Sequence, residues 1–276
     1  MLALLSAMVV VMLGMSRDSV DAALLSGLET RREALLQSGL SMAAYELFQL
    51  GLAPERLAGQ QFRFDEGTVM LTATTDAAKV DLNASGKDLL AAAYTAAGLT
   101  TSSPQAFAVR VIDWRDPDDK ESENGAEASA YIDAKLDSLP RNGAFRSVDD
   151  LRWVMGVSDA DLQALHPYVT VHNPRGRLNA YAAPATLIGA LPKVDPATVD
   201  GVLAVRTRPG PSSSEKLDDL LLVQASLIDT APPVTYRIGL QILVSGTSEP
   251  RRAEAVLAAG TSAGIPFHVL HWSGDR

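Results

Sequence analysis

The chain contains no cysteine. A disulfide framework, a thiolate site and a cysteine-based zinc site are therefore excluded. Only four histidines occur, which gives poor support for a transition-metal cluster: His166, His172, His268 and His271. Basic residues are also few, since 24 Lys and Arg face 33 Asp and Glu and the formal net charge is −9. This acidic balance argues against a general electrostatic attraction to nucleic acid phosphates.

The first fifteen residues are apolar apart from Ser6 and read MLALLSAMVVVMLGM. They fall short of the roughly 20 residues that a helix needs to span a bilayer. They follow no basic segment and precede no clear small-residue cleavage site, which weakens a signal-peptide interpretation. A buried core helix is the plain structural alternative. We expect Met1–Met15 to be a truncated membrane-anchor helix, because a helical pattern continues beyond it.

Residues 16–50 contain no proline, and their apolar residues recur mostly at steps of three, four or seven. This spacing predicts an amphipathic helix, ended by Gly51 and Pro54. Its apolar stripe comprises Leu24, Leu28, Leu35, Leu40, Ala44 and Leu47. A stripe on one side only predicts that the helix lies against a sheet.

Strand patterns lie on both sides of a helical centre. Gln61–Phe64 and Thr68–Thr74 flank the turn Asp65-Glu66-Gly67, which predicts a hairpin. Val234–Val244 alternates apolar and polar residues, and Pro266–Trp272 predicts a closing strand. One face of Val234–Val244 carries Tyr236, Ile238, Leu240 and Ile242.

The simplest account of this order is an α+β fold in which a helical domain is inserted into a helix-plus-sheet domain. We place the anchor helix at 1–15, the helix-plus-sheet domain at 16–83 and 232–276, and the inserted helical domain at 84–231. Within the insert, Arg177–Ala180 is expected to begin a helical pair, Pro184–Leu191 and Pro196–Val205.

Pairs of short helices joined by tight turns are expected at Val148–Leu165 and Ala185–Val205. They resemble helix-hairpin-helix units, which in many proteins hold DNA phosphates. The turn Met155–Asp159 is followed by acidic residues and not by basic ones. We expect the pairs to be packing units, with nucleic-acid binding as the alternative function.

The most acidic stretch, Asp113–Glu127, reads DWRDPDDKESENGAE. Pro117 and Gly125 make a continuous helix through it unfavourable. Carboxylates crowded on a turning backbone suit a hard cation such as calcium, which takes several oxygens from different directions. A solvated acidic loop is the alternative. An enzyme based on paired carboxylates is disfavoured, since nothing in the stretch predicts an apolar setting that would raise one pKa selectively.

Five segments in this order resemble the general secretion pathway protein K family, the minor pseudopilin K of type II secretion systems. They are Lys79–Ala84, Ile112–Glu127, Pro140–Gly156, Tyr168–Val171 and Leu178–Leu191. The resemblance implies a pilin-like fold, in which a long N-terminal helix lies against an antiparallel sheet and a large all-α domain of helix-hairpin-helix type is inserted.

The same resemblance implies a role in assembly and not in catalysis. Such a subunit caps the tip of the periplasmic pseudopilus together with minor pseudopilins I and J, helps to start the fibre and limits its length during protein export across the outer membrane. It is held in the bacterial inner membrane by one N-terminal transmembrane helix, with its bulk in the periplasm. No nucleic acid and no small-molecule substrate is implied. A related pilus system with a similar tip subunit is the alternative setting.

Relatives in this family bind calcium in the inserted domain, so the resemblance also implies a structural calcium site. We expect its ligands to be Asp113, Asp116, Asp118, Asp119 and Glu127. The family's precursors carry a short basic leader and a processing junction after glycine, and this sequence starts inside the apolar helix.

Overall fold

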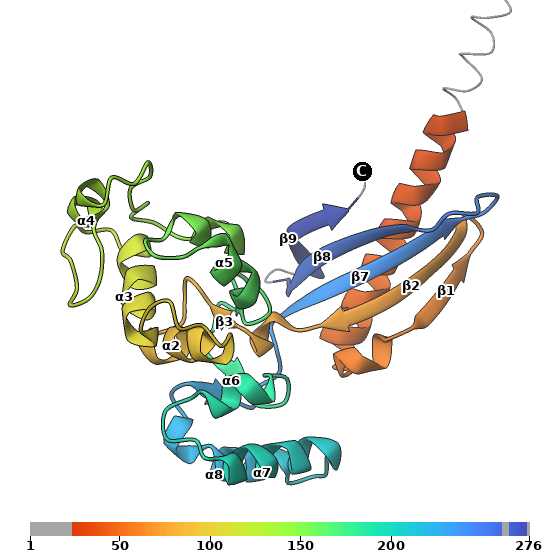
Figure 1. Cartoon of the computed structure of the whole chain (residues 1–276). Coiled ribbons are helices and arrows are strands. Elements are labelled where there is room, and N and C mark those ends of the chain that lie inside the picture. Colours follow the sequence, from red (N-terminus) through yellow and green to blue (C-terminus); the bar gives the residue numbers. More distant parts are fainter. Residues whose placement is uncertain (1–23, 261–264, 275–276) are drawn as a thin grey trace, which may run out of the picture. The chain divides into compact units, whose positions relative to one another are not determined.

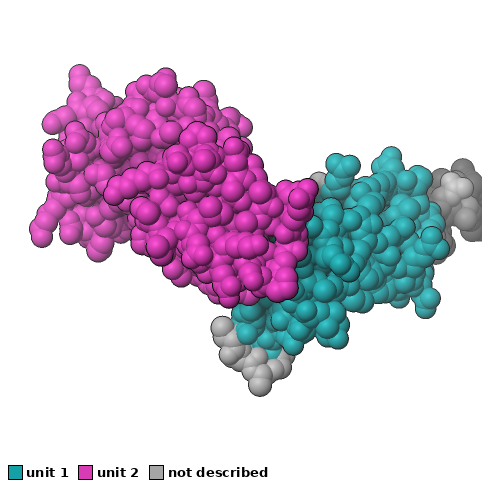
Figure 2. Space-filling model, turned by 90° about the horizontal axis from the view of Figure 1, so that it is seen from below, with its two compact units in different colours: residues 1–74, 236–276 teal, residues 75–235 magenta. Residues whose placement is uncertain are grey.

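The computed structural model describes residues 24–260 and 265–274. The chain forms two compact units, which Figure 2 shows in different colours. Unit 1 consists of Met1–Thr74 and Tyr236–Arg276, and unit 2 of Thr75–Thr235. The expected anchor Met1–Met15 lies outside the described residues, as do residues 16–23 of the predicted helix.

Unit 1 contains a five-stranded sheet of order β1-β2-β7-β8-β9 (Figure 1). The strands are β1 (Gln60–Phe64), β2 (Gly67–Thr74), β7 (Thr235–Val244), β8 (Arg251–Ala259) and β9 (Phe267–Gly274). Antiparallel pairing joins β1 to β2, β2 to β7 and β8 to β9. Since β2 and β7 are neighbours in the sheet but flank unit 2 in sequence, unit 2 is an insertion. The predicted α+β architecture is confirmed.

The hairpin between β1 and β2 turns where the sequence predicts it, with Phe64 opposite Gly67. Gly67 has a φ of +153°, and a Cβ there would lie 2.2 Å from the carbonyl oxygen of Leu243. No residue other than glycine fits this close approach of two strands.

The N-terminal helix covers residues 24–44 of the described chain and continues into a π-helical turn, η1 (Tyr45–Gln49). The 3₁₀ turn η2 (Pro54–Leu57) then leads into β1. Four residues of the predicted stripe are buried: Leu35, Leu40, Ala44 and Leu47. They pack against the sheet residues Val69, Leu71, Ile238 and Leu240. The inclusion of Leu24 in the stripe was wrong, because its side chain is 62% exposed.

The helix approaches the sheet closely at Gly39. A Cβ on Gly39 would lie 2.8 Å from Val69 Cγ1 and 3.0 Å from Leu240 Cδ2. The helix-on-sheet packing of unit 1 therefore depends on a missing side chain as well as on the leucines around it.

Unit 2 begins with η3 (Asp76–Ala78), β3 (Val80–Asp81), α2 (Lys87–Ala96), α3 (Pro104–Arg115) and α4 (Ala128–Asp133). Its middle holds η4 (Val148–Trp153), α5 (Asp159–Leu165), β4 (Val169–Thr170), β5 (Leu178–Asn179) and α6 (Ala185–Gly189). It ends with α7 (Pro196–Thr207), α8 (Ser213–Leu220), η5 (Leu222–Gln224) and β6 (Ile228–Asp229). One apolar core runs through it, with Tyr94, Phe107, Trp114 and Tyr131 among its members.

Two short parallel strand pairs accompany the helices of unit 2, β3 with β4 and β5 with β6. The expected helical pair forms as α6 and α7, but the Arg177–Ala180 segment before it is not helical, since Leu178–Asn179 pairs with Ile228–Asp229. The amides of Leu178 and Ala180 donate to the carbonyls of Leu227 and Asp229. Long-range backbone pairing overrides the local apolar spacing here.

Because of the β3–β4 pair, the inserted unit begins earlier in the sequence than expected. The expected boundaries lay at 83/84 and 231/232, whereas unit 2 starts at Thr75 and ends at Thr235. Val80 and Asp81 belong to unit 2 because their partners are Val169 and Thr170. The side chain of Thr75 also donates to the carbonyl of Thr235, so both ends of the insert meet.

The helix starts in the η4–α5 region follow the sequence closely. Ser147 and Ser158 both form capping boxes, with Asp150 and Asp161 as the acidic partners. In each box the serine oxygen and the acid satisfy amides that the first helical turn leaves free.

Candidate metal site

Three acidic side chains of the Asp113–Glu127 stretch converge at one point in unit 2. Asp113 lies in the last turn of α3, Asp116 caps the C-terminus of α3, and Glu127 occupies the N-cap position of α4. One carboxylate oxygen of each lies within 4.8 Å of the others. Asp113 and Glu127 are buried, and Asp116 is half-buried. The stretch is thus no simple loop, because its first three residues form the last turn of α3, which holds the buried carboxylate of Asp113.

Backbone amides of the following loop hold Asp113. Its Oδ2 accepts hydrogen bonds from the amides of Ala126, at 2.9 Å, and Ser122, at 3.3 Å. Its Oδ1 is buried and has no hydrogen-bond partner. Asp113 itself has no exposed surface. One oxygen is therefore satisfied by the protein, and the other is buried without a donor.

Glu127 is the least satisfied residue of the cluster. It is only 2% exposed, and neither of its carboxylate oxygens has a hydrogen-bond partner. Oδ1 of Asp116 is buried without a partner as well. Buried carboxylate oxygens are normally paired with hydrogen bonds or cations, because dehydrating a charge costs several kcal/mol.

The pKa values of the cluster also reflect buried carboxylates that lack a compensating positive charge. Burial, followed by the nearby charges of Asp113 and Asp116, raises the pKa of Glu127 from 4.5 to about 7. Burial and then Asp113 also raise the pKa of Asp116, against the opposing charge of Arg115. The prediction that no carboxylate here has a selectively raised pKa was wrong. Sequence alone could not reveal it, since the burial of Glu127 depends on tertiary packing.

Asp118 and Asp119 lie outside this cluster, and both are exposed. Oδ1 of Asp118 accepts a hydrogen bond from the amide of Lys120. Asn142 Nδ2 donates to the backbone oxygen of Asp118 and, at 2.9 Å, to Oδ1 of Asp119. These two acids therefore fasten the loop to the segment around Asn142.

Asn142 is a residue that the sequence pattern did not single out. Its Oδ1 is buried without a partner, although its Nδ2 has two acceptors. Its φ of +50° suits asparagine, which tolerates the left-handed region better than most residues. The dipeptide Asn142-Gly143 signals a turn, but no sequence signal ties it to the acidic stretch.

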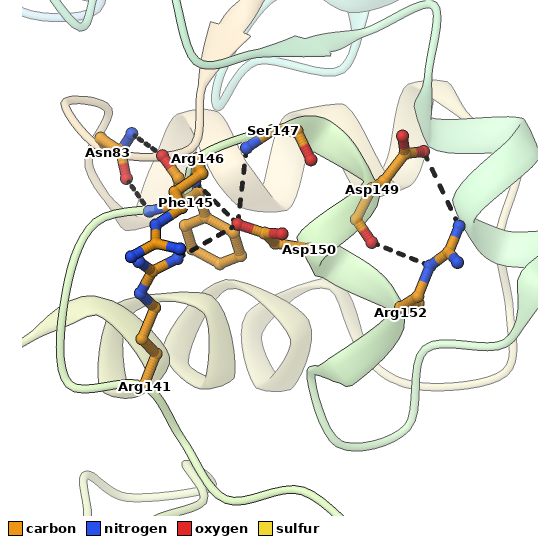
Figure 3. Close-up of polar contacts among 8 residues, drawn as sticks. All are labelled: Asn83, Arg141, Phe145, Arg146, Ser147, Asp149, Asp150 and Arg152. Carbon is orange, nitrogen blue, oxygen red and sulfur yellow. Dashed lines mark hydrogen bonds and ion pairs between the residues drawn. The ribbon is translucent and has the colours of Figure 1, made fainter.

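The segment after Asn142 is anchored to the rest of unit 2, as Figure 3 shows. The side chain of Asn83 pairs with the backbone of Phe145, accepting from its amide at 2.7 Å and donating to its carbonyl at 3.0 Å. Asp150 accepts from the amides of Arg146 and Ser147 and lies 3.6 Å from Arg141. The acidic loop is thus tied to a segment that is itself fixed.

The helix-hairpin-helix turn is occupied by a side chain of the same unit. Nη1 of Arg110 donates to the carbonyl of Met155 at 3.3 Å. A Cβ on Gly156 would lie 2.5 Å from that nitrogen. Arg110 therefore packs against this turn within the same unit, which favours the packing interpretation.

The segment Gly260–Gly264 reads GTSAG and matches the Gly-x-Ser-x-Gly spacing of a hydrolase nucleophile. Residues 261–264, with Ser262 among them, lie outside the described residues. The segment joins the antiparallel strands β8 and β9, whereas the hydrolase motif needs a strand-to-helix turn. The spacing alone carries no catalytic assignment.

Unit 1 carries a groove of about 570 Å³ between the N-terminal helix and β9. Leu36, Leu40, Val269 and Trp272 form its apolar lining, and Glu29 and Arg32 are among its charged residues. Across the described ranges, no helix combines the length and the apolar character that crossing a bilayer requires.

Comparison with known proteins identifies the relatives of this chain. Residues 70–174 match the model of the family described as type II secretion system protein K. A curated type II secretion system protein K from Pseudomonas aeruginosa is 27% identical over 143 residues. The match covers 51% of this chain and 42% of that relative, so the chain spans less than half of the relative's length.

A solved structure supports the fold over almost the whole chain. It is titled as the GspK-GspI-GspJ complex of the type 2 secretion system of enterotoxigenic Escherichia coli. The matched chain has a TM-score of 0.59 and 15% identity, covering 95% of this chain and 98% of its own length. Family model, curated relative and solved fold agree, and the resemblance of this chain to protein K of type II secretion systems is thereby confirmed.

Proposed function

We propose that this chain is a minor pseudopilin that assembles with minor pseudopilins I and J at the tip of a type II secretion pseudopilus. The match in fold to a chain of a GspK-GspI-GspJ complex, over 95% of this chain, carries the proposal. The helix-on-sheet unit with an inserted second unit also agrees with the fold that the family resemblance implies. In this role the chain starts the fibre, limits its length and acts without catalysis, anchored in the inner membrane with its bulk in the periplasm.

The test is co-expression of the chain with the I and J pseudopilins encoded in the same genome. We expect the three proteins to co-elute in gel filtration. Elution of this chain apart from both, at concentrations of tens of micromolar, overturns the partnership.

The fibre role has its own test. Deleting the gene in cells that overproduce the major pseudopilin should lengthen the surface fibres. Unchanged fibre length and number would leave the partnership standing and remove the tip-capping role.

We also propose that Asp113, Asp116 and Glu127 bind a structural calcium ion. The residues fit the ion, because several buried carboxylate oxygens that face one cluster have no hydrogen-bond partner. Calcium takes six to eight oxygen ligands, so waters or neutral protein oxygens complete the set, and Asn142 Oδ1 is a buried oxygen available near this loop. The bound ion would supply the positive charge that this cluster lacks and would join the end of α3 to the start of α4.

Thermal unfolding of the purified chain in calcium or in chelator tests the site. At calcium concentrations a hundredfold above Kd the ion should contribute about 2.7 kcal/mol. For a unit of this size that equals a rise in Tm of about 5–10 °C. Magnesium should give a smaller rise, because it demands stricter octahedral geometry.

Neutral variants within the same stretch supply the controls. Asp116→Asn should abolish most of the calcium-dependent rise in Tm. Asp118→Asn and Asp119→Asn change exposed acids outside the cluster and should keep it. Equal Tm values in calcium and chelator for the unaltered chain would refute the site.

A further inference from the structure

We propose that Gly125 is a positioning residue of the calcium site, and that it makes Asp113 bind the ion through Oδ1 alone. This inference rests on the calcium site proposed above. It assigns a function to a glycine that the sequence pattern marks only as a helix breaker.

The argument begins with the space around Gly125. A Cβ on this residue would lie 1.8 Å from Asp113 Oδ2 and 2.8 Å from its Cγ. Real Cβ atoms do not approach other atoms so closely, so any side chain would displace the carboxylate or the loop. Gly125 is not among the residues with positive φ. Glycine is therefore required here for the close approach of backbone and carboxylate, and not for its dihedral freedom.

The close approach sets the hydrogen bonds of Asp113. The amide of Gly125 donates to the carbonyl of Ser122 at 2.8 Å and closes a turn. That turn aims the amides of Ser122 and Ala126 at Oδ2 of Asp113. Together they fix the carboxylate and occupy one of its oxygens.

The remaining oxygen of Asp113 has no partner in the protein. Asp113 Oδ1 is buried and accepts no hydrogen bond. With Oδ2 held by two amides, Asp113 can offer the ion only Oδ1. Ligands whose orientation is fixed by surrounding hydrogen bonds bind metals more tightly than mobile ones, because less order is lost on binding. A side chain at 125 should therefore weaken calcium binding even though residue 125 donates no ligand.

The experiment measures calcium affinity of the full chain by titration calorimetry for Gly125→Ala and for the control Gly143→Ala. Gly143 lies in a neighbouring loop, where an added Cβ would have its nearest neighbour at 3.8 Å. We expect Gly125→Ala to lower the affinity at least tenfold and Gly143→Ala to change it less than twofold. Gly125→Ala with an affinity within threefold of the unaltered chain would overturn the inference.

A double-mutant cycle separates positioning from a general loss of folding. If Gly125 acts through Asp113, Gly125→Ala should cause no further loss of affinity in an Asp113→Ala background. Multiplicative losses of affinity would show that the two residues act independently and would overturn the inference.

Terbium luminescence provides a readout that a purely structural role would leave unchanged. Trp114 follows Asp113 in α3 and can sensitise a bound terbium ion. We expect the Gly125→Ala variant to show weaker luminescence at subsaturating terbium, with an unchanged circular dichroism spectrum in chelator. If the unaltered chain binds neither calcium nor terbium, the proposed calcium site is refuted. If the unaltered chain binds and the Gly125→Ala variant binds equally well, the site stands and only the role of Gly125 is refuted.

Discussion

The two units differ in the kinds of side chain that they bury. Within residues 24–260 and 265–274, the buried polar and charged side chains all lie in unit 2. They are Thr75, Asp76, Asp81, Ser85, Asp113, Glu127, Asp161, Thr170, Asn173, Asn179, Ser213, Gln224 and Thr235. The buried side chains of unit 1 are apolar, and most of them belong to the N-terminal helix or to the sheet.

This difference shows two ways of specifying a fold. In unit 1 a regular apolar period on the helix meets a regular apolar alternation on the strands, so packing alone selects the arrangement. In unit 2 the elements are short, and polar side chains join them at particular backbone groups. Asn173, for example, donates through Nδ2 to the carbonyls of Lys79 and Arg177. Unit 2 should therefore be sensitive to single polar substitutions, and unit 1 to changes of volume.

The largest effect is expected for Asp81→Ala in unit 2. The carboxylate of Asp81 accepts hydrogen bonds from the amides of Asn83, Ala84 and Asn173, at 2.7–2.9 Å. Removing it leaves these partly or fully buried donors without an acceptor, which should lower the free energy of unfolding by about 3–5 kcal/mol. Hydrogen exchange, read separately for peptides of each unit, should show faster exchange in unit 2 alone. A loss below about 1 kcal/mol would contradict the importance of buried polar anchors.

A smaller effect, confined to unit 1, is expected for Gly39→Val. The added side chain would clash with Val69 and Leu240, and overpacking of this kind costs about 1–3 kcal/mol. Gly27→Val is the matched control on the same helix, since a Cβ at Gly27 meets no atom within 4 Å. Urea unfolding should show a lower midpoint for Gly39→Val than for Gly27→Val. Equal midpoints would mean that the helix does not pack closely on the sheet at Gly39.

The smallest effect, of opposite sign, is expected for Glu127→Gln in the metal-free chain. At pH 8 the variant should be more stable than the unaltered chain by about 1 kcal/mol, because it removes a buried charge that has no partner. It should also lose most of the stabilisation by calcium. Glu123→Gln, which changes an exposed acid of the same stretch, should do neither.

The same variant tests the pH dependence. With its pKa raised from 4.5 to about 7, Glu127 holds its proton more tightly in the folded than in the unfolded chain. Its contribution to stability is complete below about pH 4.5 and declines as the pH rises through about 7. Unfolding in chelator between pH 5 and 8 should show this decline in the unaltered chain and a smaller one in Glu127→Gln. Parallel curves would contradict the raised pKa.

Local pattern predicted the elements of unit 1 well, because each residue's burial there follows from its position in a period. Tyr236, Ile238, Leu240 and Ile242 are all buried on one face of β7, as expected. The same reasoning failed for Leu24, since the helix stripe alone does not tell where the sheet beneath it ends. In unit 2 the capping serines were predictable, because a helix cap depends only on residues that are close in sequence to the helix start.

An apparent internal repeat in unit 2 shows the limit of such reasoning. Asp81–Ala84 and Arg177–Ala180 share the letters Leu-Asn-Ala. In the structure the equivalent residues are Asp81 and Asn179, which end strands β3 and β5 and accept from the amides two residues on. The structurally equivalent residues are therefore two positions away from those that the sequence match aligns. Strand pairing, and not sequence identity, determines which residues are equivalent.

The sequence by itself determined that a helix-and-sheet unit encloses a mainly helical insert, and that carboxylates gather between residues 113 and 127. Periodicity and composition suffice for these features, since they depend on neighbours along the chain. Only the tertiary structure decided that Asp113, Asp116 and Glu127 meet while Asp118 and Asp119 stay outside. That choice arises because the last turn of α3 holds Asp113 in the core and the loop folds back over its carboxylate, through the space left by Gly125, to bring Glu127 beside it.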